Sequence, residues 1–349
     1  MTRFEYRITF SSPAFLGNAE QNGQWRTPPF KALLRQWWRI VHASERGGSP
    51  PVDQLREEEG ALFGVASDQR NGSRKSGVRL RLQHWNMGQQ ETWPPLARVQ
   101  HPEVNFPVDS GLYLGFGPVL LPKGAKQPAL KKNAALQAGE SATLSIACPD
   151  DAVPSLQTAF YLIDRYGTIG GRSRNGWGSF QLSLPDETAP LAKPRLATSL
   201  LRPWRACLGQ DWPHAIGSDD EGPLIWQTTQ SFNDWRGVMQ QLAALKIGLR
   251  TQFPFKTGNG AHLPEKRHWL SYPVTRHSVK SWGNARLPNS LRFKVRAEPN
   301  GDGFRGLIVH LPCLPPAQPF RPDRRAIEAV WAQVHAYLDQ AQALTRAPH

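Results

Sequence analysis

The sequence has 349 residues, of which 39% are hydrophobic, so it is long enough and apolar enough for two globular domains. Lysine and arginine outnumber aspartate and glutamate by 42 to 28, and the net charge of +14 favours nucleic acid or another anionic partner. The 13 tryptophans favour nucleic acid, because aromatic rings stack on bases. No run of about 18 apolar residues occurs, so we expect no membrane partner.

The cysteines indicate the redox state and the metal content to expect. Cys148, Cys207 and Cys313 lie far apart and are odd in number, which is typical of reduced thiols in a cytoplasmic protein. The sequence contains no Cys-x-x-Cys pair, paired carboxylates or nucleotide-binding loop. We therefore expect a cytoplasmic protein that has neither a metal site nor a cofactor.

The first half predicts alternating strands and helices. Apolar and polar residues alternate over 4–10, as in a half-buried strand. Thr27 followed by Pro28 marks the start of a helix that runs to about Ala43. Further strands are predicted over 78–85, 112–121, 141–147 and 179–184, and helices over 57–62 and 150–166. This β-α-β-β-α-β order, with additional hairpins, is that of a ferredoxin-like split βαβ domain, which RNA-recognition modules share.

The first long helix carries basic and aromatic residues beside its apolar stripe. Lys31, Arg35, Arg39 and His42 fall on this second face, with Trp38 between them. The face is either a solvated charge stripe or an RNA-facing stripe, and the sequence favours neither strongly. His42 has two interpretations as well, a general base or a structural histidine at the end of a helix.

A glycine-rich stretch, 166–180, is the most distinctive part of the sequence. It contains Arg172, Arg174, Trp177 and five glycines: Gly167, Gly170, Gly171, Gly176 and Gly178. Backbone amides and guanidinium groups in such a loop can surround phosphate oxygens, and Trp177 can stack on a base or pack beneath the loop. The spacing matches neither a Walker loop nor a dinucleotide fingerprint, so it indicates a polyanion rather than a nucleotide cofactor. The alternative is a structural turn.

The second half predicts another α/β domain, without a glycine loop. The predicted domains are 1–184 and 223–349, joined by a Pro- and Ala-rich linker over 185–222. Strands are predicted over 224–229, 287–296 and 304–311, and helices over 234–252 and 323–344. The last two strands are joined by a glycine-containing hairpin turn.

A basic insertion, 251–287, interrupts this second domain. Its candidate RNA contacts are Lys266, Arg267, Arg276 and Lys280, and tryptophan, tyrosine and histidine residues lie between them. Cations that hold phosphates and rings that stack on bases are typical of a single-strand groove. A disordered basic loop is the alternative. The histidines have no accompanying cysteine or carboxylate pattern, so we expect no metal here.

Four pieces of the first half together resemble a known family. The pieces are Phe15-Leu16-Gly17, Arg26-Thr27-Pro28 with the basic helix, Leu62-Phe63-Gly64 with the strand from Val78, and the glycine loop from Gly170 to Phe180. In this order they resemble the RAMP superfamily of CRISPR proteins, and within it the first subunit of the type III-B (Cmr) effector complex. The resemblance covers roughly residues 1–184. It implies an α+β fold with two ferredoxin-like, RRM-like domains in tandem.

The resemblance also implies a function. It implies a non-catalytic subunit in antiviral defence that lies at the 3′ end of the guide RNA and contacts guide and target RNA. Its partners would be the other subunits of a type III CRISPR effector complex. Carried over to this sequence, the candidate RNA contacts are Lys31, Arg35, Trp38 and Arg39 on the helix, and Gly170, Gly171, Arg172, Arg174 and Trp177 in the loop.

The alternative is an enzyme of the same superfamily. A metal-independent endoribonuclease that processes precursor guide RNA would use His42 as general base, with Lys31 or Tyr6 assisting. Such enzymes typically carry the glycine loop near the C-terminus, whereas here it lies mid-chain. A general single-strand RNA-binding protein outside CRISPR is a third hypothesis, which the ordered four-piece pattern disfavours.

Overall fold

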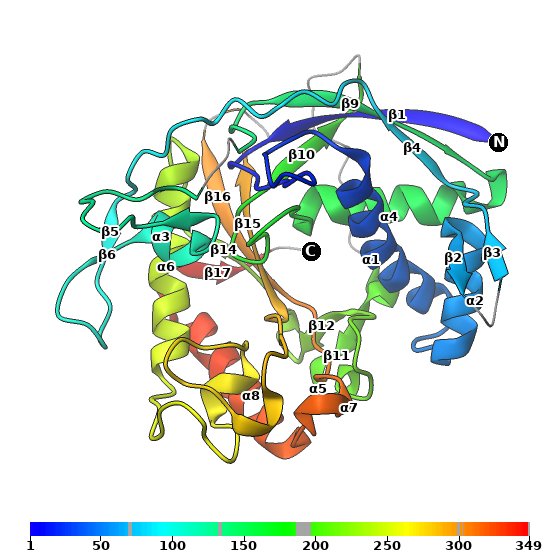
Figure 1. Cartoon of the computed structure of the whole chain (residues 1–349). Helices are drawn as coiled ribbons and strands as arrows, with labels where there is room; N and C mark the ends of the chain where they lie inside the picture. The colour runs from blue at the N-terminus through cyan, green and yellow to red at the C-terminus, as the bar shows by residue number, and fades with distance from the viewer. Residues whose placement is uncertain (69–71, 132–134, 186–196, 299–300, 302, 348–349) are drawn as a thin grey trace.

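The fold was analysed in a computed structural model that describes residues 1–68, 72–131, 135–185, 197–298, 301 and 303–347. Over these residues the chain forms a mixed α/β fold with two four-stranded sheets and several smaller ones. In Figure 1 the first large sheet lies along the top of the molecule and the second stands below it, near the centre. No helix in these ranges is long and apolar enough to cross a membrane.

The first large sheet has the strand order β10-β1-β9-β4, and all neighbouring strands are antiparallel. Its strands are β1 (Thr2–Phe10), β4 (Arg79–Leu82), β9 (Ser141–Cys148) and β10 (Phe180–Ser183). Helices α1 (Thr27–Glu45) and α4 (Val153–Tyr166) pack beneath it (Figure 1). Alternate residues of β1 and β9 are buried against these helices, as the sequence alternation predicted.

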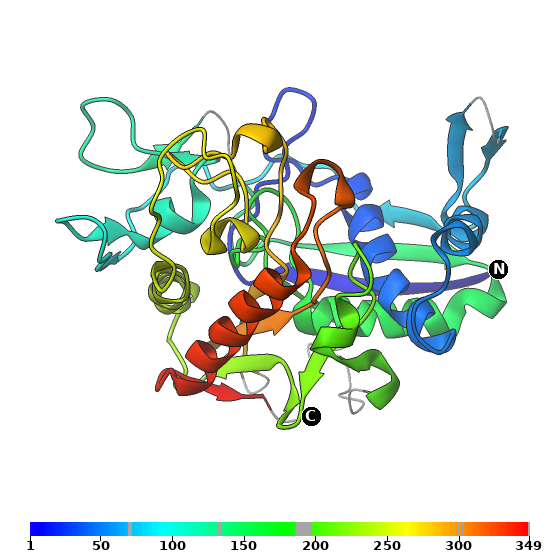
Figure 2. The ribbon, with the colours of Figure 1, turned by 90° about the horizontal axis from the view of Figure 1, so that it is seen from below.

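The second large sheet has the order β15-β16-β14-β17. Its strands are β14 (Ile225–Thr228), β15 (Leu291–Ala297), β16 (Phe304–His310) and β17 (Leu344–Arg346), and its helices are α6 (Trp235–Thr251) and α8 (Arg324–Gln340). Its connectivity matches that of the first sheet: in both, the first strand in sequence pairs with the third and the fourth. Figure 2 shows α8 in the foreground of this half.

Shorter elements connect and extend the two sheets. In the first half they are α2 (Val52–Phe63), β2 (Val65–Asp68), β3 (Gly72–Arg74), β5 (Arg98–Val99), β6 (Val108–Asp109), α3 (Ser110–Gly115), β7 (Val119–Leu120), β8 (Ala129–Leu130) and η1 (Asp150–Ala152). In the second half they are η2 (Thr198–Leu200), β11 (Leu201–Pro203), α5 (Trp204–Cys207), β12 (Ile216–Asp219), β13 (Gly222–Pro223), η3 (Lys266–Trp269), η4 (Lys280–Trp282) and α7 (Ala317–Phe320).

Two predicted elements were wrong. The apolar stretch 112–121 is not one strand: its first residues belong to the short helix α3, which Asp109 caps by accepting a hydrogen bond from the Leu112 amide, and only Val119–Leu120 form a strand, β7. The last helix ends at Gln340 rather than 344, and β17 follows it as an unpredicted edge strand. Of the predicted linker 185–222, residues 186–196 lie outside the described residues, and 197–222 form η2, β11, α5, β12 and the start of β13.

The two halves share their hydrophobic cores. Trp177 of the first half lies in the core built on α6 and α8, while Ile225 and Val309 of the second half lie in the core built on α1 and α4. One face of β15 also packs against the first half: Lys294 Nζ donates three hydrogen bonds at the end of α4, to the carbonyl oxygens of Ile163, Asp164 and Gly167. The halves therefore contact each other through buried side chains.

Candidate nucleic-acid interface

The glycine loop between α4 and β10 is folded closely on itself and on the segment around Phe15. Gly178 has a φ of +63°, and a Cβ there would lie 1.9 Å from the Ile169 carbonyl oxygen. Gly170 has a φ of +89°, and its Cβ would lie 2.7 Å from the Phe15 carbonyl oxygen. Glycine is required at both positions, because any side chain would collide with backbone.

The loop amides are largely used within the protein. The Gly171 amide donates to the Phe15 carbonyl at 2.9 Å, and the Gly178 amide donates to the Pro13 carbonyl at 2.8 Å. These N–H groups are not free to surround a phosphate, which corrects the expectation of an amide cradle at Gly171. The glycines instead allow close backbone packing, which fixes the position of Arg172.

Trp177 is a core residue and not a base-stacking surface. Its side chain is 0% exposed and its ring packs against those of Trp93, Phe15 and Trp235, at centroid distances of 5.1, 5.4 and 5.8 Å. This corrects its assignment as an RNA contact and leaves the other interpretation, packing beneath the loop. A fully buried ring cannot reach a base.

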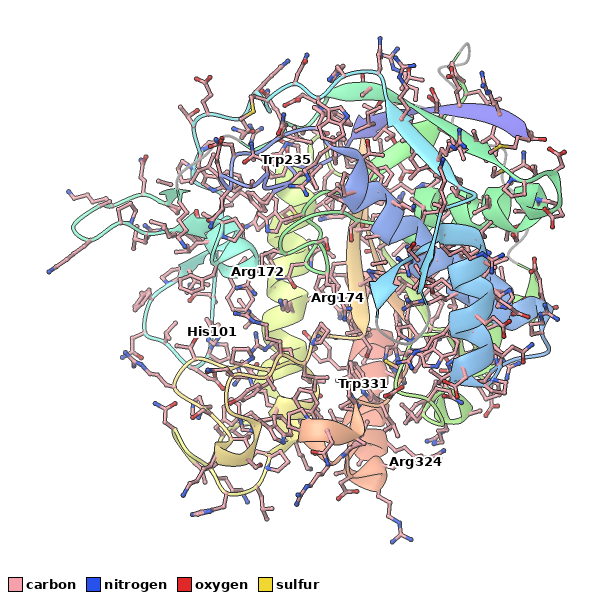
Figure 3. The ribbon with its side chains drawn as sticks, turned by 45° about the vertical axis from the view of Figure 1, so that its right-hand side comes forward. His101, Arg172, Arg174, Trp235, Arg324 and Trp331 are labelled. Carbon is pink, nitrogen blue, oxygen red and sulfur yellow. The ribbon has the colours of Figure 1, made fainter. Side chains whose placement is uncertain are left out.

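Arg172 points away from this core. It is exposed and adopts a positive φ of 56°, and its guanidinium group has no hydrogen-bond or ion-pair partner within the described part of the chain. Partial burial and the nearby Arg286 both lower the pKa of its guanidinium. Figure 3 shows Arg172 near the middle of the molecule, with His101 below it. An arginine in this position has donors available for an anion.

Helix α6 brings further cations to Arg172. Lys246 is buried, and its Nζ donates to Asn175 Oδ1 of the glycine loop at 2.6 Å. Burial lowers the pKa of Lys246 well below its usual value, and Arg250 and Arg172 lower it further. We call Arg172, Lys246, Arg250 and Arg286 the cationic cluster. None of the four forms an ion pair among the described residues.

Two buried polar atoms, one in the cationic cluster and one next to it, lack a hydrogen-bond partner among the described residues. The Tyr113 hydroxyl and Arg250 Nε are buried without a hydrogen bond to any described residue. Lys246 Nζ lies 5.9 Å from the centre of the Tyr113 ring, and the centre of the His101 ring lies 5.8 Å from that of Tyr113. Buried polar atoms without partners are unusual in native proteins, and they can be satisfied by a bound ligand. The unpaired charges and the unsatisfied donors thus occur in one place.

Arg174 is turned inward rather than toward this cluster. Its side chain donates to the Asn289 carbonyl of the second half, and burial lowers its pKa. Arg292 lies nearby, buried over the Trp37 ring. Its burial, together with a smaller effect of the positive charge of Arg174, lowers the pKa of Arg292 to about 9. Arg174 therefore contributes to the contact between the halves in this structure.

The basic side chains of α1 also have hydrogen-bond or ion-pair partners within the protein. Arg35 and Arg39 both pair with the buried carboxylate of Glu59 in α2, whose pKa is lowered because their hydrogen bonds outweigh its burial. Lys31 Nζ donates to Ser76 Oγ at 2.8 Å. Trp38 is 4% exposed, so it does not offer a ring to a base, which corrects its assignment as an RNA contact.

His42 lies within this same contact between helices. Its ring stacks on that of Trp38, with centroids 4.4 Å apart, and its Nε2 contacts Glu58 of α2. Lys31 lies 11 residues earlier on α1, about 16 Å along the helix axis. Tyr6 is buried beside Phe160, and burial raises its pKa to about 12. The proposed nuclease residues are therefore not brought together.

The basic insertion 251–287 is folded rather than a free groove. Its rings Trp269, Tyr272 and Trp282 belong to the second core, and Arg267 is buried in an ion pair with Glu103 at 2.6 Å. This corrects the role of Arg267 and of the rings as RNA contacts, because none is accessible. The exposed cations that have no ion pair with any described residue are Lys256, Lys266, Arg276, Lys280 and Arg286. Lys266, Arg276 and Lys280 stay predicted contacts.

Sequence reasoning missed most of the cationic cluster. Lys246 occupies a position in the apolar stripe of α6, between Leu242 and Leu249, and a lysine there is an available signal. Arg250 follows one turn later on the same face. Arg286 lies in the predicted basic insertion but was not among the chosen residues. Among the described residues, no group of three or more histidine, cysteine or acidic side chains is arranged to hold a metal.

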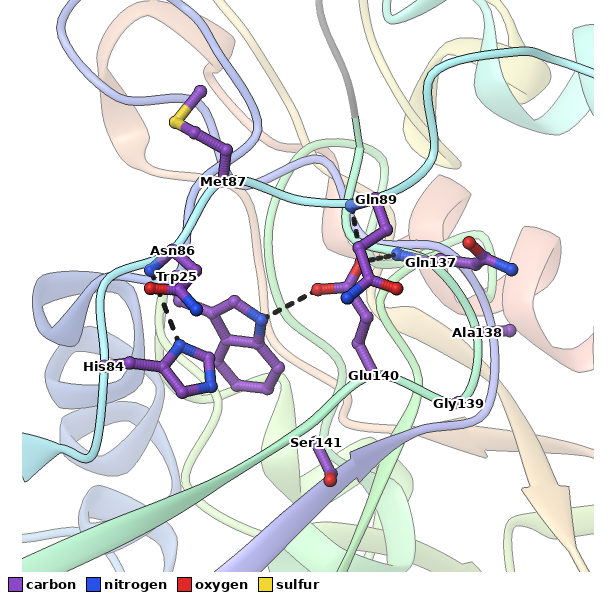
Figure 4. Close-up of a pocket in the computed structure, with 10 residues that line it drawn as sticks. All are labelled: Trp25, His84, Asn86, Met87, Gln89, Gln137, Ala138, Gly139, Glu140 and Ser141. Atoms are coloured by element: carbon purple, nitrogen blue, oxygen red, sulfur yellow. Dashed lines mark hydrogen bonds between the residues drawn. The ribbon is translucent and has the colours of Figure 1, made fainter.

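A polar pocket of about 340 Å³ lies where β9 begins, with Glu140 and Ser141 in its lining (Figure 4). Its carboxylate, Glu140, accepts from Trp25 Nε1 at 3.0 Å and from the amides of Gln89 and Gln137 at 2.7 and 2.6 Å. These three hydrogen bonds give Glu140 a structural role in holding the loops together. The pocket offers no cation for a phosphate among its lining residues.

Comparison with known proteins gives structural matches only. No protein-family model and no curated protein sequence matches this chain. Its structure is similar to the crystal structure of apo Cmr1 from Pyrococcus furiosus, with 15% identity and a TM-score of 0.49, covering 99% of this chain and 98% of that chain. It is also similar to a chain in the cryo-EM structure of the type III-B Cmr-beta complex bound to cognate target RNA, with 12% identity and a TM-score of 0.47, over 95% and 99% of the two chains.

A second cryo-EM structure of the Cmr-beta complex, with target RNA, AMPPnP and single-stranded DNA, matches with 12% identity and a TM-score of 0.45. The match covers 96% of this chain and 98% of that chain.

Proposed function

We propose that this chain is a non-catalytic RNA-binding subunit of a type III-B CRISPR effector complex. The observation that carries the proposal is the cationic cluster, in which Arg172, Lys246, Arg250 and Arg286 gather without a carboxylate partner among the described residues. Gathering like charges in a partly desolvated place is unfavourable, and an anion that enters it relieves the repulsion. RNA carries a phosphate at every nucleotide and fits this requirement.

Each half of the chain is proposed to be a ferredoxin-like domain. The support is the shared connectivity of the two sheets, β10-β1-β9-β4 and β15-β16-β14-β17, each with two helices on one face. The proposed bounds stay 1–184 and 223–349. The cationic cluster lies where the glycine loop of the first domain meets α6 of the second, so it requires both domains.

The place in the complex follows from the sequence resemblance. The subunit is proposed to act in the cytoplasm, in antiviral defence, at the 3′ end of the guide RNA, in contact with guide and target RNA and with neighbouring subunits. Contacts through phosphates make recognition largely independent of base sequence, because phosphates carry no sequence information. Base pairing between guide and target would then supply the specificity.

The proposal of a non-catalytic role rests on how the nuclease candidates are placed. His42 is buried against α2, Tyr6 is buried in the first core, and Lys31 lies near the other end of α1 from His42. A general base and a general acid must both lie within hydrogen-bond reach of the reacting groups. These three side chains do not meet that requirement in one place.

A cleavage and binding assay tests the proposal directly. The purified chain is incubated with end-labelled repeat–spacer RNA without divalent metal, and native and denaturing gels are run in parallel. We expect intact RNA with a shifted mobility, and a weaker shift for Arg172→Ala plus Arg286→Ala. A discrete metal-free cut that disappears in His42→Ala would make the chain a processing nuclease. RNA that is neither shifted nor cut would reject both functions.

A further inference from the structure

A second pocket, of about 350 Å³, lies directly beside the glycine loop. Three segments form its walls: the turn 15–23, the β7–β8 hairpin with Gly117 and Pro118, and Gly171 of the glycine loop. Backbone hydrogen bonds join them, from the Gly171 amide to the Phe15 carbonyl at 2.9 Å and from the Lys131 amide to the Pro118 carbonyl at 2.8 Å. Backbone hydrogen bonds therefore join the segments that carry the lining residues.

The lining of this pocket suits a flat, uncharged ring. Phe15, Pro118 and Leu130 supply apolar surface, and glycines supply flat backbone. The lining contains no acidic side chain, and its single charged residue, Lys131, is exposed. Ligand pockets of this volume that are mainly apolar take small ring systems.

Cations stand at the rim of the pocket. A Cβ added to Gly117 would lie 3.4 Å from a terminal nitrogen of Arg172, so the guanidinium group lies against the pocket wall. Lys131 stands on the same rim. A ring that enters the pocket would thus carry its attached phosphate close to Arg172. Phe116, next to Gly117, is 61% exposed and adds a ring outside the pocket.

We infer that this pocket receives one unpaired nucleobase of the bound RNA strand, while Arg172 and the cationic cluster hold the adjoining phosphates. Proteins that bind single strands commonly take up splayed-out bases in this way. The pocket gives a function to Phe15, Leu16 and Gly17, a sequence motif that the cationic cluster does not use. The inference rests on the proposed RNA-binding function and adds a base site to it.

The test compares two short strands with the same number of phosphates, a hexamer of uridine and a hexamer of abasic ribose. Binding of each is measured by fluorescence anisotropy with the full chain. The variant Gly17→Leu adds an apolar side chain at a residue that lines the pocket, where a Cβ meets only the Gln21 backbone within 4 Å. Ala19→Leu adds the same side chain on the same loop at an exposed position outside the pocket, and serves as the matched control.

We expect the wild type to bind the uridine strand about 5- to 100-fold more tightly than the abasic strand, as base stacking provides. Gly17→Leu is expected to remove most of this preference and to leave binding of the abasic strand unchanged. Ala19→Leu is expected to change neither the preference for the uridine strand nor the binding of the abasic strand. If Gly17→Leu melts at a lower temperature, Gly171→Ala replaces it, since its Cβ would fit 3.4 Å from Phe15 and Pro118.

Four outcomes would count against the inference, and they are distinguishable. Equal wild-type affinity for both strands, or an unchanged preference in both filling variants, removes the base site and leaves the RNA-binding function standing. A loss in Gly17→Leu that is equal for both strands shows a general disruption rather than a filled base site. No binding of either strand by the wild type rejects the proposed function itself.

Discussion

At the scale of single residues, burial separates the cations that hold the fold from those available to a ligand. Arg267 and Lys294 are buried, and each has a carboxylate or carbonyl partner. Arg172 and Arg286 are exposed and lack a partner in the described ranges. Composition predicts the sign of the partner's charge, whereas only the structure distinguishes these two groups, because exposure depends on contacts made across the chain.

The first prediction concerns Arg172. Because its guanidinium has no partner among the described residues, Arg172→Ala should leave the melting temperature unchanged and lower the affinity for single-stranded RNA about tenfold, the value of one charge-assisted contact of about 1.5 kcal/mol. Calorimetry and anisotropy measure the two effects. Arg325→Ala, which removes an exposed arginine from α8, is the control and should change neither. A loss of stability without a loss of affinity would contradict this role.

The second prediction concerns Lys294 and pH. Burial lowers the pKa of Lys294 from its usual 10.5 to about 7 in the folded chain. Between these values the unfolded chain binds more protons at this site than the folded chain, so stability should rise as the pH rises above 7. Denaturant unfolding from pH 7.0 to 8.0, where the thiols of the unfolded chain are still mostly protonated, should show a slope of up to about 1.4 kcal/mol per pH unit.

The control for this pH dependence is Lys294→Met, which removes the titrating group. The variant removes an amine that donates to the carbonyl oxygens at the end of α4, so it should be less stable than the wild type at pH 8.0. Its stability should depend less on pH over the same range. An identical slope in wild type and variant would show that another group titrates.

At the scale of elements, α2 determines whether the arginines on the basic face of α1 are available to a ligand. The sequence predicted both a basic stripe on α1 and a short acidic helix over 57–62. It did not predict that Glu59 of α2 would pair with Arg35 and Arg39, because that contact depends on how the two helices pack. The basic face thus became a structural ion-pair network rather than an open RNA surface.

The third prediction tests this network. Glu59→Gln should lower the free energy of unfolding by about 1–3 kcal/mol, since it leaves Arg35 and Arg39 without their carboxylate. RNA affinity should not fall, because the change frees two cations and removes none. Glu57→Gln, at an exposed position of the same helix, is the matched control and should have little effect on stability. A fall in RNA affinity for Glu59→Gln with unchanged stability would contradict this assignment.

Long periodic elements were predictable from sequence, and short ones were not. The apolar stripe of α1 and the alternation in β1 identified both elements, because their burial repeats over many residues. The stretch 112–121 was misread because its glycines and apolar residues fit either a strand or a turn of helix, and the Asp109 cap decides between them. Strand β17 has three residues and gains its stability from pairing with β14.

At the scale of the whole molecule, the candidate site is assembled from distant segments. The cationic cluster joins Arg172 of the glycine loop, Lys246 and Arg250 of α6, and Arg286 of the basic insertion. The glycine loop was predictable because its composition is unusual within a short window. The other three were not, because nothing local shows that α6 packs against that loop. Both halves must therefore be present for RNA to bind at this site.

The most direct test of the central claim is the salt dependence of RNA affinity. Binding of a uridine oligomer is measured from low to high salt for the wild type and for Arg172→Ala plus Arg286→Ala. The control, Arg79→Ala plus Arg325→Ala, removes two exposed arginines elsewhere. Each lost phosphate contact should reduce the slope of log affinity against log salt by about 0.7, so the cluster variant should lose about 1.4 and the control none. Equal slopes for the wild type and the cluster variant would show that RNA phosphates do not bind at the cationic cluster.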